Sequence, residues 1–212
     1  MIGTLISRDV RRGLTGAAWL PVAFFLLVAT LMPFAIGPDA RLLGRIGPGA
    51  LWIAALTAAL LPIERLMEPD RADGVLDQLA LHGLAEESVA AAKIIAHWLT
   101  FAPLLLIAAV PASALLAMDS ASLARTELAL AAGTPGLASL AVAVSAVTAG
   151  LPRAGSLAGL LLLPLAVPLL IFGAAASGGG GSGALLLEAA NSLLLTAGAP
   201  YVAAAAIRAA RT

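Results

Sequence analysis

Cysteine is absent from the sequence, so the chain has no disulfide framework, no thiolate metal site and no prosthetic group linked through cysteine. Charged side chains are also scarce: they make up 11% of the 212 residues, whereas hydrophobic side chains make up 61%. A soluble domain needs far more polar surface than this, because water must solvate its exterior. The shortage of charge therefore excludes an ordinary soluble fold and indicates a membrane protein.

Lysine is nearly absent as well, and Lys93 is the single one. A phosphate-binding loop of the GxxxxGK[ST] type requires a Gly-Lys pair, but the residue before Lys93 is Ala92. We therefore expect that the chain is not an enzyme itself, and that another subunit carries out any ATP hydrolysis its task requires. The formal net charge is zero, which gives no basis for nucleic-acid binding.

The sequence contains several long stretches without a charged residue, whereas a soluble protein would have charges at regular intervals. A helix of about 20 apolar residues spans the hydrocarbon core of a bilayer. A Gly-Ser tract at residues 177–183 divides the last and longest stretch, and we interpret it as a hairpin between two helices. The expected fold is all-α, a single membrane domain over residues 1–212 with six transmembrane helices at about 15–36, 46–63, 94–118, 128–151, 155–176 and 189–207.

The distribution of lysine and arginine predicts the orientation, because cytoplasmic loops carry an excess of both. With the N-terminus inside, nine basic residues fall on the cytoplasmic side and three on the outer side. Both termini are therefore predicted to be cytoplasmic, which requires an even number of spans. The inner residues are Arg8, Arg11, Arg12, Arg65, Arg71, Lys93, Arg153, Arg208 and Arg211, and the outer ones are Arg41, Arg45 and Arg125.

The first dozen residues have the pattern of a short amphipathic helix. Apolar side chains recur at helical spacing, opposite a basic face. The apolar residues are Ile2, Leu5, Ile6 and Val10, and the basic ones are Arg8, Arg11 and Arg12. Such a helix can lie in the cytoplasmic interface with its arginines near lipid headgroups. A frayed, polar start of the first span explains the pattern equally well.

The one sizeable polar segment, residues 64–93, connects the second and third spans. It holds seven acidic and three basic side chains, so we expect it to be solvated and cytoplasmic. Asp73-Gly74 marks a turn within it, and Val75, Leu76 and Leu79 then form a short apolar stripe. A short helix displayed there suits the docking of a soluble partner, although a solvated connection explains the segment as well.

Few side chains near the predicted spans are candidates for chemistry. His97 lies just inside the third span beside Trp98. An imidazole there can ligate haem iron, but it is more often an interfacial, hydrogen-bonded residue, with tryptophan at the headgroup level. Glu188 lies after the Gly-Ser tract and directly before the predicted sixth span, so we expect it at the outer mouth of that span, sharing a face with Asn191 and Ser192. No cluster of histidine and carboxylates has the spacing of a metal site.

Motifs spread along most of the chain follow the pattern of one known family. Residues 33–39 read Pro-Phe-Ala-Ile-Gly-Pro-Asp, and residues 73–79 read Asp-Gly-Val-Leu-Asp-Gln-Leu. Further matching stretches are 46–52, 93–99, 133–135 and 163–173. Together they resemble CcmB, the haem exporter protein B family of bacterial cytochrome c maturation; the motif at 73–79 is shared more loosely by ABC-2 exporter permeases. The chain departs from the family pattern at Val75, usually a small hydroxyl residue, and at 82–83, where proline is common.

The resemblance implies a permease subunit in the bacterial inner membrane that works with a separate ATPase, CcmA, and with the membrane subunits CcmC and CcmD. The haem chaperone CcmE would be an indirect partner. Haem would be a transported or handled ligand rather than a firmly bound cofactor. We place the contact with the ATPase on five residues of the 64–93 segment, and name two polar or haem-proximal candidates in the third span. The contact residues are Asp73, Gly74, Leu76, Asp77 and Leu79, and the haem-proximal candidates are His97 and Trp98.

Two other functions are compatible with the sequence. A generic ABC-2 exporter of lipid or drug would share the fold and the motif at 73–79. A scaffold that transports nothing could instead relay motion from the ATPase to the haem-handling subunit. Gene neighbourhood separates the first alternative from the family function, and an assay of haem flux in vesicles separates the second.

Overall fold

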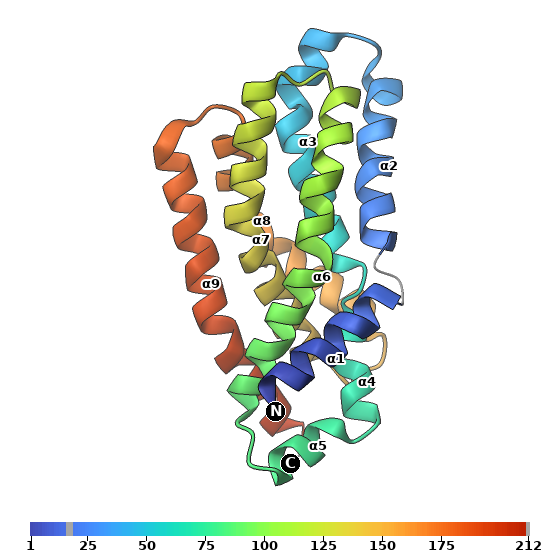
Figure 1. Ribbon diagram of the computed structural model, residues 1–212, viewed down its shortest axis with the longest axis vertical. Coiled ribbons are helices and arrows are strands. Elements are labelled where there is room, and N and C mark those ends of the chain that lie inside the picture. Colours follow the sequence, from blue (N-terminus) through green and yellow to red (C-terminus); the bar gives the residue numbers. More distant parts are fainter. Residues whose placement is uncertain (16–18, 211–212) are drawn as a thin grey trace.

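Nine helices and no strand make up the part of the chain that the computed structural model describes, residues 1–15 and 19–210. Six helices are long and apolar enough to cross a membrane, which confirms the all-α architecture with six spanning helices (Figure 1). They are α2 (Trp19–Ile36), α3 (Ala40–Leu60), α6 (Glu86–Leu115), α7 (Ser120–Thr148), α8 (Ala154–Ser177) and α9 (Gly181–Ala209). The predicted start of the first span, residues 15–18, falls largely outside the described residues.

Three shorter helices, α1 (Ile2–Thr15), α4 (Glu64–Ala72) and α5 (Val75–Leu81), lie at one end of the bundle, together with both termini (Figure 1). We call this end the terminal end. The predicted amphipathic N-terminal helix is confirmed as α1, which buries Leu5 and packs against α6. With six spans, both termini are at the same end, and the prediction that this end is cytoplasmic stays a prediction.

The polar segment predicted between the second and third spans is itself helical. Helix α4 ends at Ala72 with Asp73 as its C-cap, and Gly74 follows with a φ of 70°, in the left-handed region that glycine adopts without strain. The predicted turn is therefore present, and α5 begins directly after it. The rest of the segment from Glu86 onward forms the first turns of α6.

The spanning helices extend beyond the apolar stretches from which we predicted them. Helix α3 begins at Ala40 and α7 at Ser120, rather than near residues 46 and 128. Each starts after an aspartate whose side chain accepts backbone N–H groups of the first turn, Asp39 for α3 and Asp119 for α7. The polar residues after these caps are helical because backbone hydrogen bonding continues past the hydrocarbon boundary.

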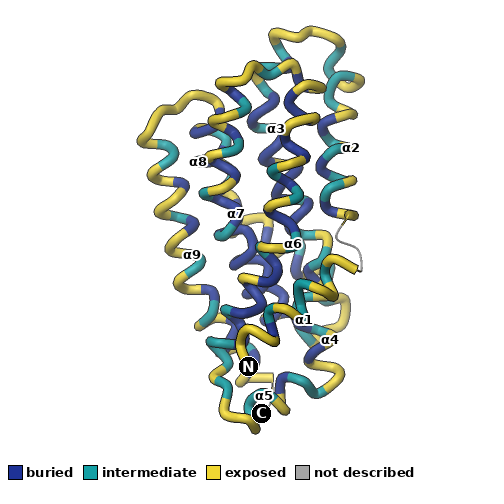
Figure 2. Tube along the Cα trace, viewed as in Figure 1, coloured by how far each residue is buried: buried dark blue, intermediate teal, exposed yellow. Residues whose placement is uncertain are grey.

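Helix α7 is the most buried of the six long helices, and α2 is the least buried. Figure 2 shows the central helices buried and the outward faces of the peripheral helices exposed. Large apolar side chains such as Phe34, Leu160 and Leu193 are 70% or more exposed (82%, 70% and 71%). Exposure of large apolar side chains on several spanning helices fits a surface covered by lipid. Small residues along α7 let its neighbours approach closely, since a Cβ added at Gly136 would lie 2.9 Å from Ser192 Cα on α9.

Candidate functional site

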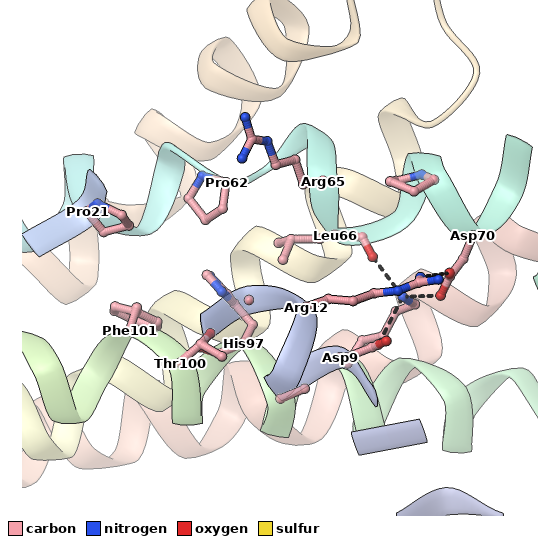
Figure 3. A pocket seen from close by; sticks show the side chains of 14 residues that line it. Asp9, Arg12, Pro21, Pro62, Arg65, Leu66, Asp70, His97, Thr100 and Phe101 are labelled. Carbon is pink, nitrogen blue, oxygen red and sulfur yellow. Dashed lines mark hydrogen bonds and ion pairs between the residues drawn. The ribbon is translucent and has the colours of Figure 1, made fainter. Parts of the chain in front are cut away.

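A cavity of about 270 Å³ lies at the terminal end, between α1, the α3–α4 junction and α6. One side of it is charged and the other is mainly apolar (Figure 3). The charged side chains are Asp9, Arg12, Arg65, Asp70 and Lys93, and the opposite side includes Pro21, Pro62, His97, Thr100 and Phe101. The cavity is therefore built from residues that are far apart in the sequence.

The charged side of the cavity centres on a buried ion pair between α4 and α6. Lys93 Nζ lies 2.7 Å from Asp70 Oδ2, and the two side chains are 5% and 2% exposed. Lys93 also donates a hydrogen bond to the Leu66 carbonyl oxygen at 2.9 Å, and it lies 3.2 Å from Asp9 Oδ2. Loss of one partner of such a pair would leave an uncompensated buried charge.

Two arginines of α1 complete this charged cluster. Arg8 donates to Asp70 Oδ2, and Arg12 Nη1 donates to Asp70 Oδ1 at 3.1 Å. Burial lowers the pKa of Arg8, but its hydrogen bonds and charge interactions with Asp9 and Asp70 outweigh burial and raise that pKa above its ordinary value. One aspartate thus joins α1, α4 and α6. The sequence suggested lipid headgroups or a frayed polar start of the first span for Arg8 and Arg12, and neither interpretation included this role.

His97 lies on α6 on the other side of the same cavity (Figure 3). Its side chain is 4% exposed, and its ring stacks on Phe101 with centroids 4.8 Å apart and an angle of 29° between the planes. Within the described residues, Nε2 has no hydrogen-bond partner. A buried polar atom without a partner is costly, so Nε2 is the atom that a ligand in the cavity would satisfy.

Trp98, the second haem-proximal candidate, points elsewhere. Its Nε1 donates to Thr134 Oγ1 on α7 at 3.1 Å, and it is not among the residues that line the cavity. The structure thus separates two neighbours in sequence: His97 faces the cavity, and Trp98 joins α6 to α7. Successive residues of a helix point about 100° apart, which explains the separation.

The five residues predicted to contact an ATPase all lie at or beside the turn between α4 and α5. Asp73 and Asp77 are exposed, whereas Leu76 is buried and Leu79 is half-buried. Leu76 and Asp77 line a second cavity of about 490 Å³, which also borders Ala146 on α7 and Ile207 on α9. Helix α5 therefore has one face toward the bundle and one toward solvent.

Leu81, at the end of α5, is 87% exposed, the highest value among the large hydrophobic side chains of the described residues. Sequence reasoning did not single it out, because it falls outside the 73–79 motif. The sequence feature that could have identified Leu81 is its place directly before His82-Gly83, where a helix would be expected to end.

Helix α4 is tied to the spans at two further points. Gly150, in the turn between α7 and α8, donates its backbone N–H to Glu68 Oε2 at 2.7 Å. Ser145 Oγ of α7 donates to the carbonyl oxygen of Ile63 at 2.7 Å. These bonds join α4 and the residue before it to the end of α7 and the turn that follows. Since α4 also continues α3 in the chain, displacement of α4 would be transmitted to α3 and α7.

Glu188 is placed differently from our expectation of an outer interfacial position. Helix α9 begins at Gly181, eight residues before the predicted start of the sixth span. Glu188 therefore lies in the second turn of the helix, faces the bundle, and is 0% exposed. The glycines of the Gly-Ser tract continue into the helix because the hairpin needs only the few residues between α8 and α9.

No group of three or more histidine, aspartate or glutamate side chains is positioned to hold a metal ion anywhere in residues 1–15 and 19–210. Among the described residues, none joins His97 in such a group. The site thus consists of a small cavity with one free imidazole nitrogen, a buried charged cluster beside it, and a two-faced helix at the terminal end.

These features define a polytopic membrane protein with a helical segment that links its spans to one aqueous side. The chain belongs to the CcmB family: the family model described as CcmB protein matches residues 1–211. Together with the six spanning helices, this membership makes it a multi-pass protein of the bacterial inner membrane.

The chain is similar over most of its length to proteins called heme exporter protein B. It is 42% identical to that of Bradyrhizobium diazoefficiens over 174 residues, which cover 81% of this chain and 78% of the relative. It is 44% identical to that of Rhodobacter capsulatus over 172 residues, covering 80% and 79%. It is 42% identical to that of Escherichia coli K12 over 152 residues, covering 72% and 69%.

Proposed function

We propose that the protein is the membrane permease subunit of an ABC-type haem exporter complex in bacterial c-type cytochrome biogenesis. Membership of the CcmB family and the name shared by its relatives, heme exporter protein B, support this function. ATP is hydrolysed in a separate subunit, CcmA, so the chain contributes motion and not catalysis. CcmC and CcmD are its membrane partners within the lipid bilayer. ATP hydrolysis in the complex also releases the haem-loaded chaperone CcmE, which is an indirect partner.

The main support for the coupling role is that α5 packs one face against the bundle and exposes the other to solvent. Leu76 is buried against the bundle, while Leu81 is 87% exposed, one helical turn after the exposed Asp77. A single exposed leucine is common on a protein surface. Here it stands at the aqueous end of a membrane protein, on the helix whose sequence resembles a permease docking motif. An apolar side chain with an acidic one beside it suits a shallow groove with a basic rim on the ATPase.

The contacts of α4 provide a route from this docking surface to the spans. Displacement of α5 moves α4, which is hydrogen-bonded to the end of α7 through Glu68 and Gly150 and continues α3 in the chain. The Asp70–Lys93 ion pair joins α4 to α6 as well. A partner that binds α5 differently in two nucleotide states would thereby bias the packing of three spans.

Haem is the proposed cargo, and His97 is its proposed contact in this subunit. Nε2 of His97 faces a cavity that Arg65 also lines, and no ion pair of Arg65 is recorded within the described residues. Imidazole binds haem iron and guanidinium binds carboxylates such as haem propionates. With a single protein ligand, contact would be transient, as handling of a cargo requires. Trp98 would hold the helix of His97 against α7.

A charge reversal of the docking surface tests the proposed coupling. Asp73→Lys combined with Asp77→Lys should reduce co-purification of CcmA at least several-fold and lower the yield of c-type cytochromes, because like charges would face the basic rim. Arg41→Glu reverses an exposed charge at the other end of the bundle and serves as the control; it should leave both readouts unchanged.

Unchanged co-purification and unchanged cytochrome yield in the double variant would overturn the docking role. Haem movement into vesicles that contain the reconstituted complex tests the cargo separately. ATP-dependent haem flux supports export; release of CcmE without flux would mean a scaffold, and export of lipid with normal cytochromes would mean a generic exporter.

A further inference from the structure

Glu188 is a fully buried carboxyl group that the proposed export role does not use. It is 0% exposed within the helix bundle, and neither Oε1 nor Oε2 has a hydrogen-bond partner within the described residues. Intramembrane acids of this kind are rare, because the ionised form is strongly disfavoured away from water.

The carboxyl group occupies a space that exists only because residue 133 is glycine. A Cβ added at Gly133 on α7 would lie 2.0 Å from Glu188 Oε1 and 2.4 Å from Cη2 of Trp52 on α3. The group therefore packs between the α7 backbone and an indole ring. Trp52 cannot stabilise a negative charge through its ring N–H, since Nε1 donates to Ser177 Oγ on α8 at 3.0 Å.

Polar groups near Glu188 are already engaged or turned away. Ser192, one turn further along α9, accepts the backbone N–H of Gly136 at 2.9 Å. Thr196 accepts from Ser139 and donates to the Ser192 carbonyl oxygen. Asn191 Nδ2 has no partner in the described part of the chain, and so it does not donate to the carboxyl group either. No donor recorded in the structure would stabilise a carboxylate.

No cation compensates Glu188 either. Helix α8 has no charged residue. Other helices packed against α9 or Trp52 do carry charged or titratable side chains, but within the described residues none of these forms an ion pair with Glu188. Those side chains are Arg41 and Arg45 on α3, Glu86, Glu87, Lys93 and His97 on α6, and Arg125 and Glu127 on α7; α9 itself adds Tyr201 and Arg208. Lys93 pairs with Asp70, and Arg208 pairs with Glu86 and Glu87.

We propose that Glu188 is a proton-binding site inside the membrane, and that its carboxyl group carries a proton while α9 is packed against α3 and α7. A neutral acid fits a dry, partnerless site of this shape, whereas a carboxylate does not. The packed state therefore binds the proton more tightly than any state in which α9 separates and water reaches the group. Packing of α9 and proton binding are thereby linked.

Infrared spectroscopy of the full chain in lipid bilayers at pH 7 tests the site. The difference between wild type and Glu188→Gln should contain one protonated-carboxyl C=O band, present in wild type and shifted in D₂O. Glu127→Gln removes another glutamate, on α7, and should leave this band in place. A difference spectrum that lacks this band and contains a carboxylate band instead would overturn the proposal. Wild-type protein with ¹³C-labelled glutamate gives the same test without a variant.

The pH dependence of stability gives a second, independent readout. The packed state holds a proton that the open state releases, so wild type should lose thermal stability relative to Glu188→Gln as pH rises. The unfolding temperature of wild type minus that of Glu188→Gln should therefore fall steadily as pH rises. A difference between the two unfolding temperatures that stays constant over the whole pH range would contradict the link between packing of α9 and proton binding. Neither measurement depends on haem or on an ATPase, so either can fail while the proposed export function stands.

Discussion

Glycine at position 133 shows how a single absent side chain sets the packing around a membrane carboxyl group. Its Cα faces both Glu188 and Trp52, and an added Cβ would come within 2.4 Å of each. At the half-buried Gly159 on α8, an added Cβ would meet nothing within 4 Å. Two glycines of equal chemistry, both inside spanning helices, therefore differ only in their surroundings.

We expect Gly133→Ala to destabilise the protein by about 2 kcal/mol, because overpacking a well-packed interior forces side chains and backbone to shift. Gly159→Ala is the matched control and should be neutral or slightly stabilising, since alanine favours helix. Unfolding in a mild detergent, followed by circular dichroism, measures both. Equal stability of the two variants would contradict the packing around Glu188.

At the residue scale, the sequence indicates which side chains are unusual but not where they point. The motif at 73–79 and the position of His97 could both be identified from sequence, because turns and isolated histidines stand out in an apolar chain. The partners could not: Lys93 meets Asp70 across 23 positions, and Asp70 meets Arg12 across 58. Such pairings depend on how helices pack, which no local pattern specifies.

Among the elements, α1 is held to the bundle by apolar packing and by polar contacts that centre on Asp70. It buries Leu5 against the bundle and is held by the hydrogen bonds of Arg8 and Arg12 to Asp70. Interfacial helices bind through their apolar face and through charge. Here the charge interaction is with the protein itself, which is why α1 lies across the terminal end rather than continuing into α2.

Removal of this aspartate should release α1. Since the chain has no cysteine, Leu5→Cys introduces a unique thiol, which is expected to react slowly with maleimide because Leu5 is 5% exposed. Combining it with Asp70→Ala should raise the rate several-fold, toward that of Ile2→Cys, whose position is 46% exposed. Labelling kinetics in detergent measure the three rates. A rate unaffected by Asp70→Ala would show that apolar contacts alone hold the helix.

The ends of the helices were the least predictable elements. Apolar runs mark the membrane-embedded portions well, so six helices could be identified from the long uncharged stretches and the Gly-Ser tract of the sequence. Their starts depend on caps such as Asp39 and Asp119 and, for α9, on how few residues the hairpin needs. The late start assumed for α9 is the physical reason that Glu188 was expected at the membrane surface.

On the scale of the whole molecule, the arrangement of charge agrees with an even number of spans. Helices α4 and α5 share the terminal end with both termini, and the turn between α2 and α3 lies at the opposite end (Figure 1). Eight of the nine basic residues assigned to the cytoplasm are in the described part of the chain; Arg211 lies outside it. The positive-inside rule then predicts that the terminal end faces the cytoplasm.

Single cysteines in this cysteine-free chain test that orientation directly. His82→Cys, just after α5, and Arg41→Cys, at the start of α3, occupy exposed positions at opposite ends of the bundle. In intact spheroplasts a membrane-impermeant maleimide should label Arg41→Cys and leave His82→Cys unlabelled, because only the outer end is accessible. Lysis should then allow both to react equally, which controls for intrinsic reactivity. The reverse pattern in intact cells would place α5 outside, where no ATPase could reach it, and would remove the basis of the proposed coupling.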